Sequence, residues 1–352
     1  MKTILQAFGL FYITLFALNP VQGQEVSHEI QLPTDLYAPG TQSFFIYLDN
    51  DKFSTRLFDE DRDYTNGISF AYSNGNLINS PLFFLNTFLL KKTWRAFHPQ
   101  AKGLDDRLQF LSPEIKLSSL AYTPRDIAAT ELITDDRPYA SVHYLEFKAR
   151  LHDKEKNYVH SLSLSYGTLA TPAAAFFQKI IHTIGTVRPL PEGWHNQIAH
   201  PWEPTMLIQY QRDRIWQPKA LPANRSFRDL RESMSVEAGY RVVGSYALTG
   251  RYGWYLGKRR QGDLFFYGRL RPHVVAYDAN LQGQFRPSAY VVSRKDIYPM
   301  RGEAALGLGL NWQWKQNRLS AGYGFYAQSP EARYPNHVRM HYYGRYWVGW
   351  IF

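Results

Sequence analysis

The chain has 352 residues, with 40 Lys and Arg against 30 Asp and Glu, and it contains no cysteine. The lack of cysteine excludes a disulfide framework, so a secreted chain of this length must be held by its core or by closure of a sheet. The formal charge of +10 suits anionic partners, although simple solubility explains it equally well.

The first 23 residues have the layout of a secretory signal peptide. Lys2 supplies a positive charge, residues 4–18 form an apolar run without charge, and Asn19 and Pro20 end that run. Small residues at Val21 and Gly23 occupy the positions that a signal peptidase reads, so we expect cleavage after Gly23. The apolar run is short for a membrane anchor, which needs about 20 residues. We expect residues 24–352 to form a single domain.

The composition of the remaining chain favours a transmembrane β-barrel. Charged residues, Gly or Pro interrupt every later apolar stretch, and mean hydropathy is −0.39, which alone would indicate a soluble secreted protein. The chain nevertheless contains 9 Trp, 25 Tyr and 22 Phe, or 16% aromatic residues. Such a composition is typical of strands that alternate lipid-facing and lumen-facing side chains between aromatic girdles.

Apolar residues alternate with polar residues or glycine along much of the sequence. In residues 303–314, Leu306, Leu308 and Leu310 alternate with Gly307 and Gly309. Residues 158–167 and 318–327 show the same alternation, and the final segment ends on an aromatic residue, as the last strand of a barrel commonly does. Polar residues and glycine on one face and apolar residues on the other indicate a barrel wall rather than a sandwich.

Counting these segments predicts an all-β, antiparallel transmembrane barrel of about twelve strands. The predicted strands begin near Ser43, Asn66, Asp106, Ala140, Tyr158, Thr205, Met234, Tyr246, Leu264, Gly302, Arg318 and His341. An even number places both termini in the periplasm, with short turns there and long loops outside. The outward loops are then residues 51–65, 123–139, 169–204, 280–300 and 329–338. Residues 74–105 are too long for a periplasmic turn and predict a plug, a periplasmic helix or a further strand.

The loop at residues 169–204 is expected to contain a short helix. Thr171 is suited to the N-cap, Pro172 to the first helical position, and Gly185 to the end of the helix. Gln178 and His182 are four residues apart and therefore share one face of this helix.

Polar clusters gather at the outward ends of several strands, at residues 49–51, 59–67 and 135–140. Each cluster alone is explained by ordinary turn chemistry or by contact with lipid headgroups. Their convergence with His182 at one end of a barrel favours a functional site. Two kinds of enzyme site are excluded. The chain has no Gly-x-Ser-x-Gly motif for a hydrolase-fold serine and no His-Glu-x-x-His motif for the zinc site of a metalloprotease.

Four motifs occur in order along the chain: Asn50-Asp51, the run from Asp61 to Gly67, the run from Asp136 to Ala140, and Gln178-x-x-x-His182 followed by Gly193-Trp194 and Gln197-Ile198. Taken together, they resemble the lipid A 3′-O-deacylase family of outer-membrane barrels. The resemblance covers most of the mature chain. It implies a calcium-dependent esterase that removes the 3′-linked acyloxyacyl group from lipid A at the outer rim of a twelve-stranded barrel.

The resemblance also implies roles for individual residues. His182 is the catalytic histidine, Gln178 its helix partner and Thr65 the hydroxyl, while Asn50 and Asp51 lie beside the Ca²⁺. This assignment is chemically consistent, because an imidazole can take a proton from water near neutral pH and calcium prefers oxygen ligands. Three arginines are candidates to hold lipid A phosphates: Arg62, Arg137 and Arg188.

The sequence departs from the family at two positions. A family lysine before the Asp-Arg-Pro-Tyr motif is missing, with Arg125 as the substitute, and a family glutamate after the histidine is matched only by the later Glu192. A non-catalytic barrel such as a porin or scaffold, and a phospholipase-type esterase, are the alternative functions. We expect a monomer in the Gram-negative outer membrane, surrounded by outer-membrane lipid, with lipopolysaccharide as substrate and no nucleic-acid partner.

Overall fold

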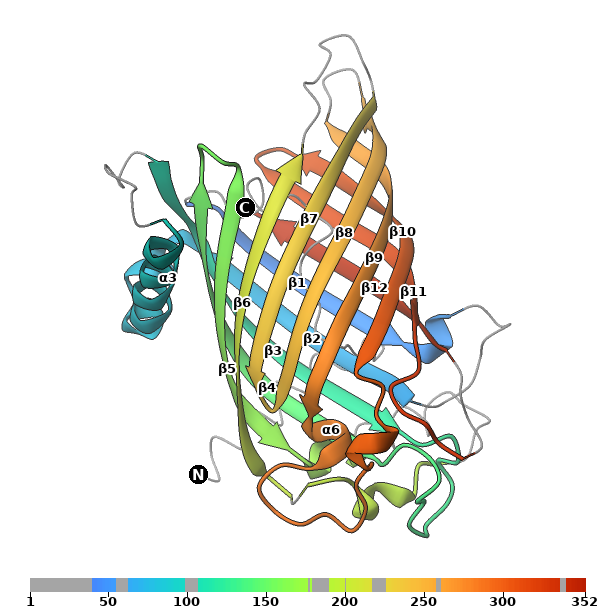
Figure 1. Ribbon diagram of the computed structural model, residues 1–352. Coiled ribbons are helices and arrows are strands. Elements are labelled where there is room, and N and C mark those ends of the chain that lie inside the picture. Colours follow the sequence, from blue (N-terminus) through green and yellow to red (C-terminus); the bar gives the residue numbers. More distant parts are fainter. Residues whose placement is uncertain are drawn as a thin grey trace, which may run out of the picture.

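The computed structural model describes residues 40–54, 63–98, 107–176, 178, 190–199, 201–216, 226–257, 261–335 and 340–352. Within these residues the chain forms a closed antiparallel barrel in which every strand pairs with its neighbours in sequence, and β1 pairs with β12 to close it (Figure 1). The strands are β1 (Gln42–Asn50), β2 (Asp63–Asn74), β3 (Leu108–Thr123), β4 (Ala140–Asp153), β5 (Tyr158–Leu169), β6 (Glu203–Trp216), β7 (Ser226–Gly239), β8 (Arg241–Leu256), β9 (Gly262–Asp278), β10 (Met300–Trp314), β11 (Asn317–Gln328) and β12 (His341–Ile351). The prediction of an all-β barrel of about twelve strands is confirmed.

Most strands begin within a few residues of their predicted starts, but β7 and β8 begin earlier. β7 starts at Ser226 instead of near Met234, and β8 starts at Arg241 instead of near Tyr246. The apolar alternation of β7 is interrupted by Arg228 and Glu232 on the face that carries Leu230. A period-two pattern of apolar residues therefore detects only the later part of this strand.

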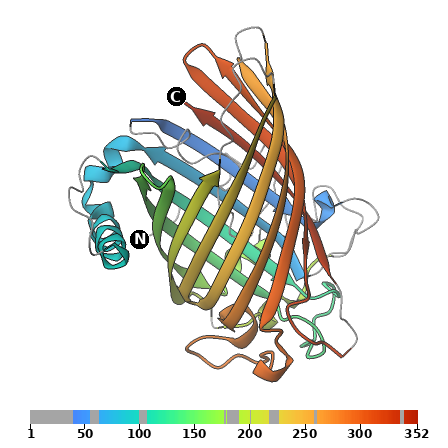
Figure 2. The ribbon, with the colours of Figure 1, turned by 45° about the horizontal axis from the view of Figure 1, so that its top comes forward.

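The outer face of the barrel is apolar and exposed, as the alternation predicts. On β10 the residues Leu306, Leu308 and Leu310 are 69%, 43% and 38% exposed. On β12 the outward row includes Tyr346 and Val348, both exposed. Figure 2 shows the steep tilt of the strands around this wall.

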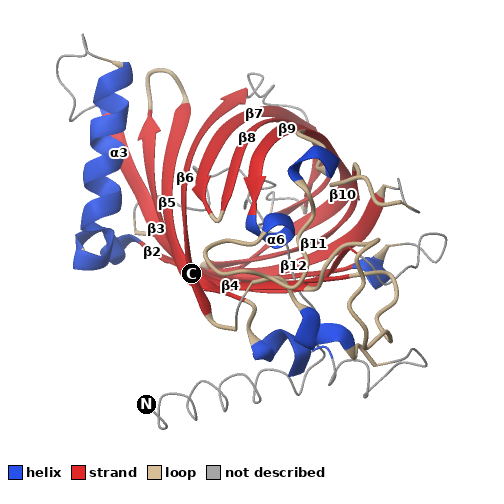
Figure 3. Cartoon of the chain, turned by 60° about the horizontal axis from the view of Figure 1, so that its bottom comes forward, coloured by secondary structure: helices blue, strands red, loops and turns tan. Residues whose placement is uncertain are grey.

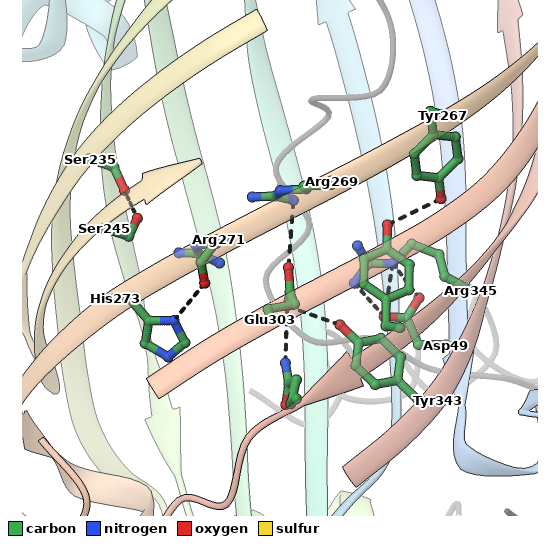
Figure 4. A network of polar contacts seen from close by, with 12 residues as sticks. Asp49, Ser235, Ser245, Tyr267, Arg269, Arg271, His273, Glu303, Tyr343 and Arg345 are labelled. Carbon is green, nitrogen blue, oxygen red and sulfur yellow. Dashed lines mark hydrogen bonds and ion pairs between the residues drawn. The ribbon is translucent and has the colours of Figure 1, made fainter. Parts of the chain in front are cut away.

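The lumen is filled with aromatic side chains and ion pairs, which the sequence pattern did not predict. Arg345 of β12 donates to both carboxylate oxygens of Asp49 on β1, with Nε–Oδ1 at 2.8 Å and Nε–Oδ2 at 2.9 Å. Nearby, Tyr343 donates to Glu303 at 3.4 Å, and Arg269 lies 3.8 Å from the same carboxylate (Figure 4). These charges are tolerated in the interior because each is paired.

Glycines on the inner face make room for these lumen side chains. A Cβ added at Gly322 would overlap the ring of Trp347, and one at Gly309 would overlap the ring of Phe265. The glycines that alternate with leucine in the sequence therefore mark where large side chains of neighbouring strands cross the lumen.

The two ends of the barrel differ. Gln42 and Phe352 exchange backbone hydrogen bonds at one end, which we call the terminal end. Two of the connections at the terminal end are tight turns, at residues 154–157 and 315–316. Long segments at the opposite end, the loop end, join β3 to β4, β5 to β6 and β9 to β10. The loop end also carries α6 (Ala279–Gln282) and the 3₁₀ helices η5 (Gly193–Asn196) and η6 (Arg294–Asp296), and Figure 3 views the barrel from this side.

The long segment between β2 and β3 contains a helix, which resolves the three possibilities left by the sequence. After two short 3₁₀ turns, η3 (Gly75–Asn79) and η4 (Pro81–Phe83), the helix α3 spans Phe84–Phe97. Figures 1 and 3 both place α3 outside the barrel wall, so it is not a plug. None of the helices in the described ranges combines the length and the apolar character needed to cross a membrane.

Candidate active site on the outer wall

At the loop end, the outer face of β1 and β2 changes from apolar to polar. Asn50 lies on the same face of β1 as the exposed Phe44, and it pairs with Asn66 of β2. A bulge at Thr65 shifts the register between β2 and β3. Because side chains alternate across a strand and a bulge interrupts this alternation, Thr65 and Asn66 both lie on the outer side.

Hydrogen bonds connect this polar patch. The amide Nδ2 of Asn50 donates to the carbonyl of Thr65 at 2.9 Å, and the hydroxyls of Thr65 and Thr123 lie 2.5 Å apart. Asn50 and Thr65, predicted from the sequence, are therefore brought together. Asn66 and Thr123 complete the patch, and sequence reasoning did not single them out. Thr123 is the last residue of β3, and this position at the end of a strand could have marked it as a candidate site residue.

Asp51 extends the patch around the barrel. It opens the 3₁₀ helix η1 (Asp51–Phe53), and its carbonyl accepts hydrogen bonds from the backbone and side chain of Ser54. This turn folds back over the outer face of β11 and β12, where Phe53 meets Tyr346 edge-on at 4.9 Å and accepts a hydrogen bond from Tyr323. Asp51, the next residue along the chain after Asn50, is 1% exposed, so its carboxylate is enclosed.

A helical segment from the β5–β6 loop lies against the outer face of β3 and β4. Residues 172–176 and 178 are helical, as Thr171 and Pro172 predict. The backbone N–H of Thr171 donates to the hydroxyl of Ser141, and Ala174 packs against Ala121 and Trp194. Gln178 is buried and its Oε1 accepts a hydrogen bond from Trp194 Nε1 at 3.0 Å. Gln178 is thus fixed against the wall by a partner from the same loop.

Two of the sequence motifs form a clamp that holds this loop on the wall. Gly193 sits directly against Tyr139, since an added Cβ would lie 2.5 Å from the tyrosine ring. The backbone N–H of Ile198 donates to the carbonyl of Tyr139 at 2.7 Å, and Ser141 donates to Gln197 at 3.1 Å. We call the contact of Tyr139 with residues 193–198 the loop clamp. Burial raises the pKa of the Tyr139 phenol, which stays a hydrogen-bond donor to Ile127.

Arg137 lies on the other side of the wall from this patch. Its guanidinium stacks on Tyr122, with 4.0 Å to the ring centre, and Tyr122 alternates with Thr123 along β3. Arg137 is 1% exposed and its Nε donates to Glu331 at 2.9 Å. Burial acts to raise the pKa of the Glu331 carboxyl, but the charges of Arg137 and Arg301 outweigh it and hold the pKa below its usual value. This placement gives Arg137 a structural role and does not bring it to Asn50.

Three of the predicted site residues lie outside the described residues: His182, Arg62 and Arg188. The structure does describe the two residues that stand in for missing family residues. Both are exposed at the loop end: Arg125 lies on the β3–β4 loop and Glu192 lies beside η5. The signal peptide, residues 1–23, also lies outside the described part of the chain.

The donor atoms around Asn50 are those that a hard cation prefers. Within the described residues no group of three or more His, Asp or Glu side chains gathers to hold a metal. The patch does contain the carboxamides of Asn50 and Asn66, and the buried Asp51 follows Asn50 in the chain. Asn66 Oδ1 is buried without a hydrogen-bond partner among the described residues. Calcium takes oxygen ligands from carboxylates and carboxamides, so this donor set fits Ca²⁺ better than a softer metal.

The fold and the position of the patch define an outer-membrane β-barrel with a polar site on its outer wall, next to a helical segment of the β5–β6 loop. The family model described as "Outer membrane protein LpxR" matches residues 10–352. The chain therefore belongs to the LpxR family of outer-membrane proteins.

The fold resembles that of a solved LpxR structure. The structure of LpxR from Salmonella typhimurium is similar with a TM-score of 0.61 at 14% identity, over 88% of this chain and 99% of that one. The β domain of the Bordetella autotransporter BrkA has a TM-score of 0.42 at 10% identity, over 89% of this chain and 98% of that one. A search of curated proteins returned no match.

Proposed function

We propose that the chain is a lipid A 3′-O-deacylase that hydrolyses the 3′-acyloxyacyl ester with a histidine base and calcium. The observation that carries the proposal is the gathering of Asn50, Thr65 and Asn66 on the outer wall of the barrel, next to a loop helix held there through Gln178. A site on the outer wall can receive a lipid laterally from the membrane, whereas a site in the packed lumen could not.

The position of the site suits a substrate of the outer leaflet. Outer-membrane barrels carry short turns in the periplasm and longer loops outside, so the loop end corresponds to the cell surface. The polar patch lies at this end, directly beyond the exposed apolar band of the wall. The acyl chains of a lipid would lie along that band while its ester and sugar reach the patch.

Each residue has a chemical task in the proposed reaction. His182, one helical turn after Gln178, takes a proton from the attacking water. The Thr65 hydroxyl can donate a hydrogen bond to the substrate. Asn50 and Asp51 would hold calcium, which would supply positive charge to polarise the ester carbonyl. A covalent nucleophile is not required, which agrees with the missing serine elbow.

The candidates for phosphate recognition are reduced to two. Arg62 and Arg188 keep this proposed role, because they belong to loops at the site end of the barrel. Arg137 donates from Nε to Glu331 and faces the lumen, so we assign it to the stability of the loop end instead.

The test uses purified protein in detergent with lipid A or phosphatidylethanolamine, and mass spectrometry of the products. We expect release of the 3′-acyloxyacyl group from lipid A, loss of activity in excess chelator and recovery with calcium. Asp51→Asn should weaken the calcium dependence because one anionic ligand is lost. Fatty acid released from phosphatidylethanolamine would favour the phospholipase alternative, and a folded barrel inactive on both lipids would contradict the proposal.

A further inference from the structure

The helix α3 is built onto the outer wall of the barrel. Its buried residues Asn86, Leu90 and Trp94 recur every four positions, so they form one face of the helix. Asn86 Nδ2 donates to two backbone carbonyls of the wall, Phe147 at 2.7 Å and Leu162 at 3.2 Å. These bonds fix the helix in one position on β4 and β5.

The wall beneath α3 is shaped to receive it. Ala149 lies under the helix and is fully buried, and Leu151 and Leu162 pack against Phe83, Leu90 and Trp94. Elsewhere the outward row of the wall consists of large exposed side chains such as Leu145 and Tyr166. The helix therefore occupies a place on the wall that lipid would otherwise cover.

The contacts at the two ends of α3 show how it runs along the barrel. Near its start, Phe83 lies edge-on to Phe147, in the middle of β4. Near its end, Trp94 lies under the guanidinium of Arg107, which is paired with Asp153, the last residue of β4 at the terminal end. A helix of 14 residues is about 21 Å long, so α3 reaches from the middle of the wall to the terminal rim.

The exposed side chains of α3 change character along this path. The first half exposes Phe84 (70%), Leu85 (47%) and Phe88 (43%), preceded by Leu82 (57%). The second half exposes Lys91, Lys92 and Arg95, and also the aromatic Phe97. The apolar half is level with the middle of the apolar wall, and the basic half is level with the rim.

We propose that α3 is embedded in the periplasmic leaflet of the membrane and binds anionic phospholipid headgroups. Its apolar half continues the lipid-facing surface of the wall, where exposed Phe and Leu side chains are favourable in hydrocarbon. Its basic half stands at the depth of the headgroups, where Lys and Arg attract phosphate. The apolar and basic side chains thus follow the change from hydrocarbon to headgroup along one helix.

Depth measurements test the immersion of α3. The native chain contains no cysteine, so single spin labels can be attached to introduced cysteines. Leu85→Cys and Ala96→Cys report on α3 in protein reconstituted into vesicles. Leu308→Cys on the wall and Lys315→Cys in a turn at the terminal end serve as references. The label at 85 should match that at 308, accessible to oxygen and shielded from a water-soluble nickel chelate, and the label at 96 should fall between the two references. The proposal would be overturned if the labels at 85 and 96 were as accessible to the nickel chelate as the label at 315. It would also be overturned if both labels were shielded from oxygen and from the chelate, as they would be under a protein partner.

Lipid selectivity tests the basic half. We compare the association of phosphatidylglycerol and phosphatidylcholine with the intact protein and with the triple variant Lys91→Gln, Lys92→Gln, Arg95→Gln. The preference for phosphatidylglycerol should fall by up to about fivefold for each charge removed. The matched control, Arg286→Gln, Arg294→Gln, Lys295→Gln, removes three exposed charges at the loop end and should keep the preference. An unchanged preference in the α3 variant would contradict headgroup binding.

Discussion

His182 follows Gln178 by four residues and lies outside the described part of the chain, whereas Gln178 itself is firmly held. Gln178 is buried and accepts a hydrogen bond from Trp194, so its side chain faces the wall. Residues four apart share a helix face, so a continued helix would direct His182 toward the same wall and the patch of Asn50 and Thr65. The arrangement supports His182 as the base in the proposed hydrolysis.

Replacing His182 with alanine should lower lipid A deacylation by roughly 10² to 10⁴ fold, because a general base is lost. The fold should survive, since a loop residue carries little of the barrel's stability. Rates are compared at equal amounts of folded protein, judged by heat-modifiable migration. The control is His152→Ala, a half-buried histidine near the terminal end of β4 and away from the site, which should keep full activity. Equal rates for both variants would remove His182 from the mechanism.

The loop clamp explains why the sequence motifs around Tyr139 and Gly193 occur together. Gly193 leaves no room for a side chain, since a Cβ would lie 2.5 Å from Tyr139 and 2.8 Å from the carbonyl of Ala129. Trp194, the next residue, reaches Gln178 and so connects the clamp to the helical segment of the β5–β6 loop. A change in the clamp should therefore reach the site without touching the barrel.

Gly193→Ala should reduce deacylation while leaving the barrel folded, because the added methyl displaces Tyr139 or the loop and shifts Gln178. Gly244→Ala serves as the control, since a Cβ there meets nothing within 4 Å and should change neither property. Activity and heat-modifiable migration are measured on both variants. Wild-type activity in Gly193→Ala would show that the clamp does not position the site.

The elements of the wall were predictable where apolar residues alternate strictly, as in β10 and β11. The start of β7 was not, because Arg228 and Glu232 interrupt its outward row. The position of α3 was also beyond prediction, since an apolar run such as residues 82–90 fits a strand or a helix equally and its partner, the outer face of β4 and β5, is distant in sequence. The site was predicted in part: Asn50, Asp51 and Thr65 lie at one end of the barrel, as the sequence indicated. Arg137, a candidate to hold lipid A phosphates, instead stacks on Tyr122 and donates to Glu331 on the lumen side.

At the scale of the whole molecule, the lumen ion pairs connect strands that are far apart in sequence. Asp49 and Arg345 join the first and last strands and are 0% and 2% exposed. The pair therefore lies at the seam where the barrel closes. Removing one charge would leave the other buried without its partner.

Asp49→Asn should lower the stability of the barrel by about 3–5 kcal/mol, the usual cost of breaking a buried pair. The contrast is Glu155→Gln, which breaks a pair with Arg107 in which the glutamate is 66% exposed and should cost less than about 1 kcal/mol. The free energy of unfolding of both variants is to be measured by urea unfolding in detergent. A loss below 1 kcal/mol for Asp49→Asn would mean that the seam is held by backbone pairing alone.

The central claim, that this outer-membrane barrel removes an acyl group from lipid A, is tested most directly by mass spectra of lipid A from cells that express the chain. Cells that lack an endogenous deacylase are compared with cells that express the intact chain or His182→Ala at equal folded amounts in the outer membrane. The intact chain should convert lipid A to a species lighter by the 3′-acyloxyacyl group, and the variant should leave lipid A at its original mass. Unchanged lipid A in cells that carry the folded, intact barrel would contradict the claim.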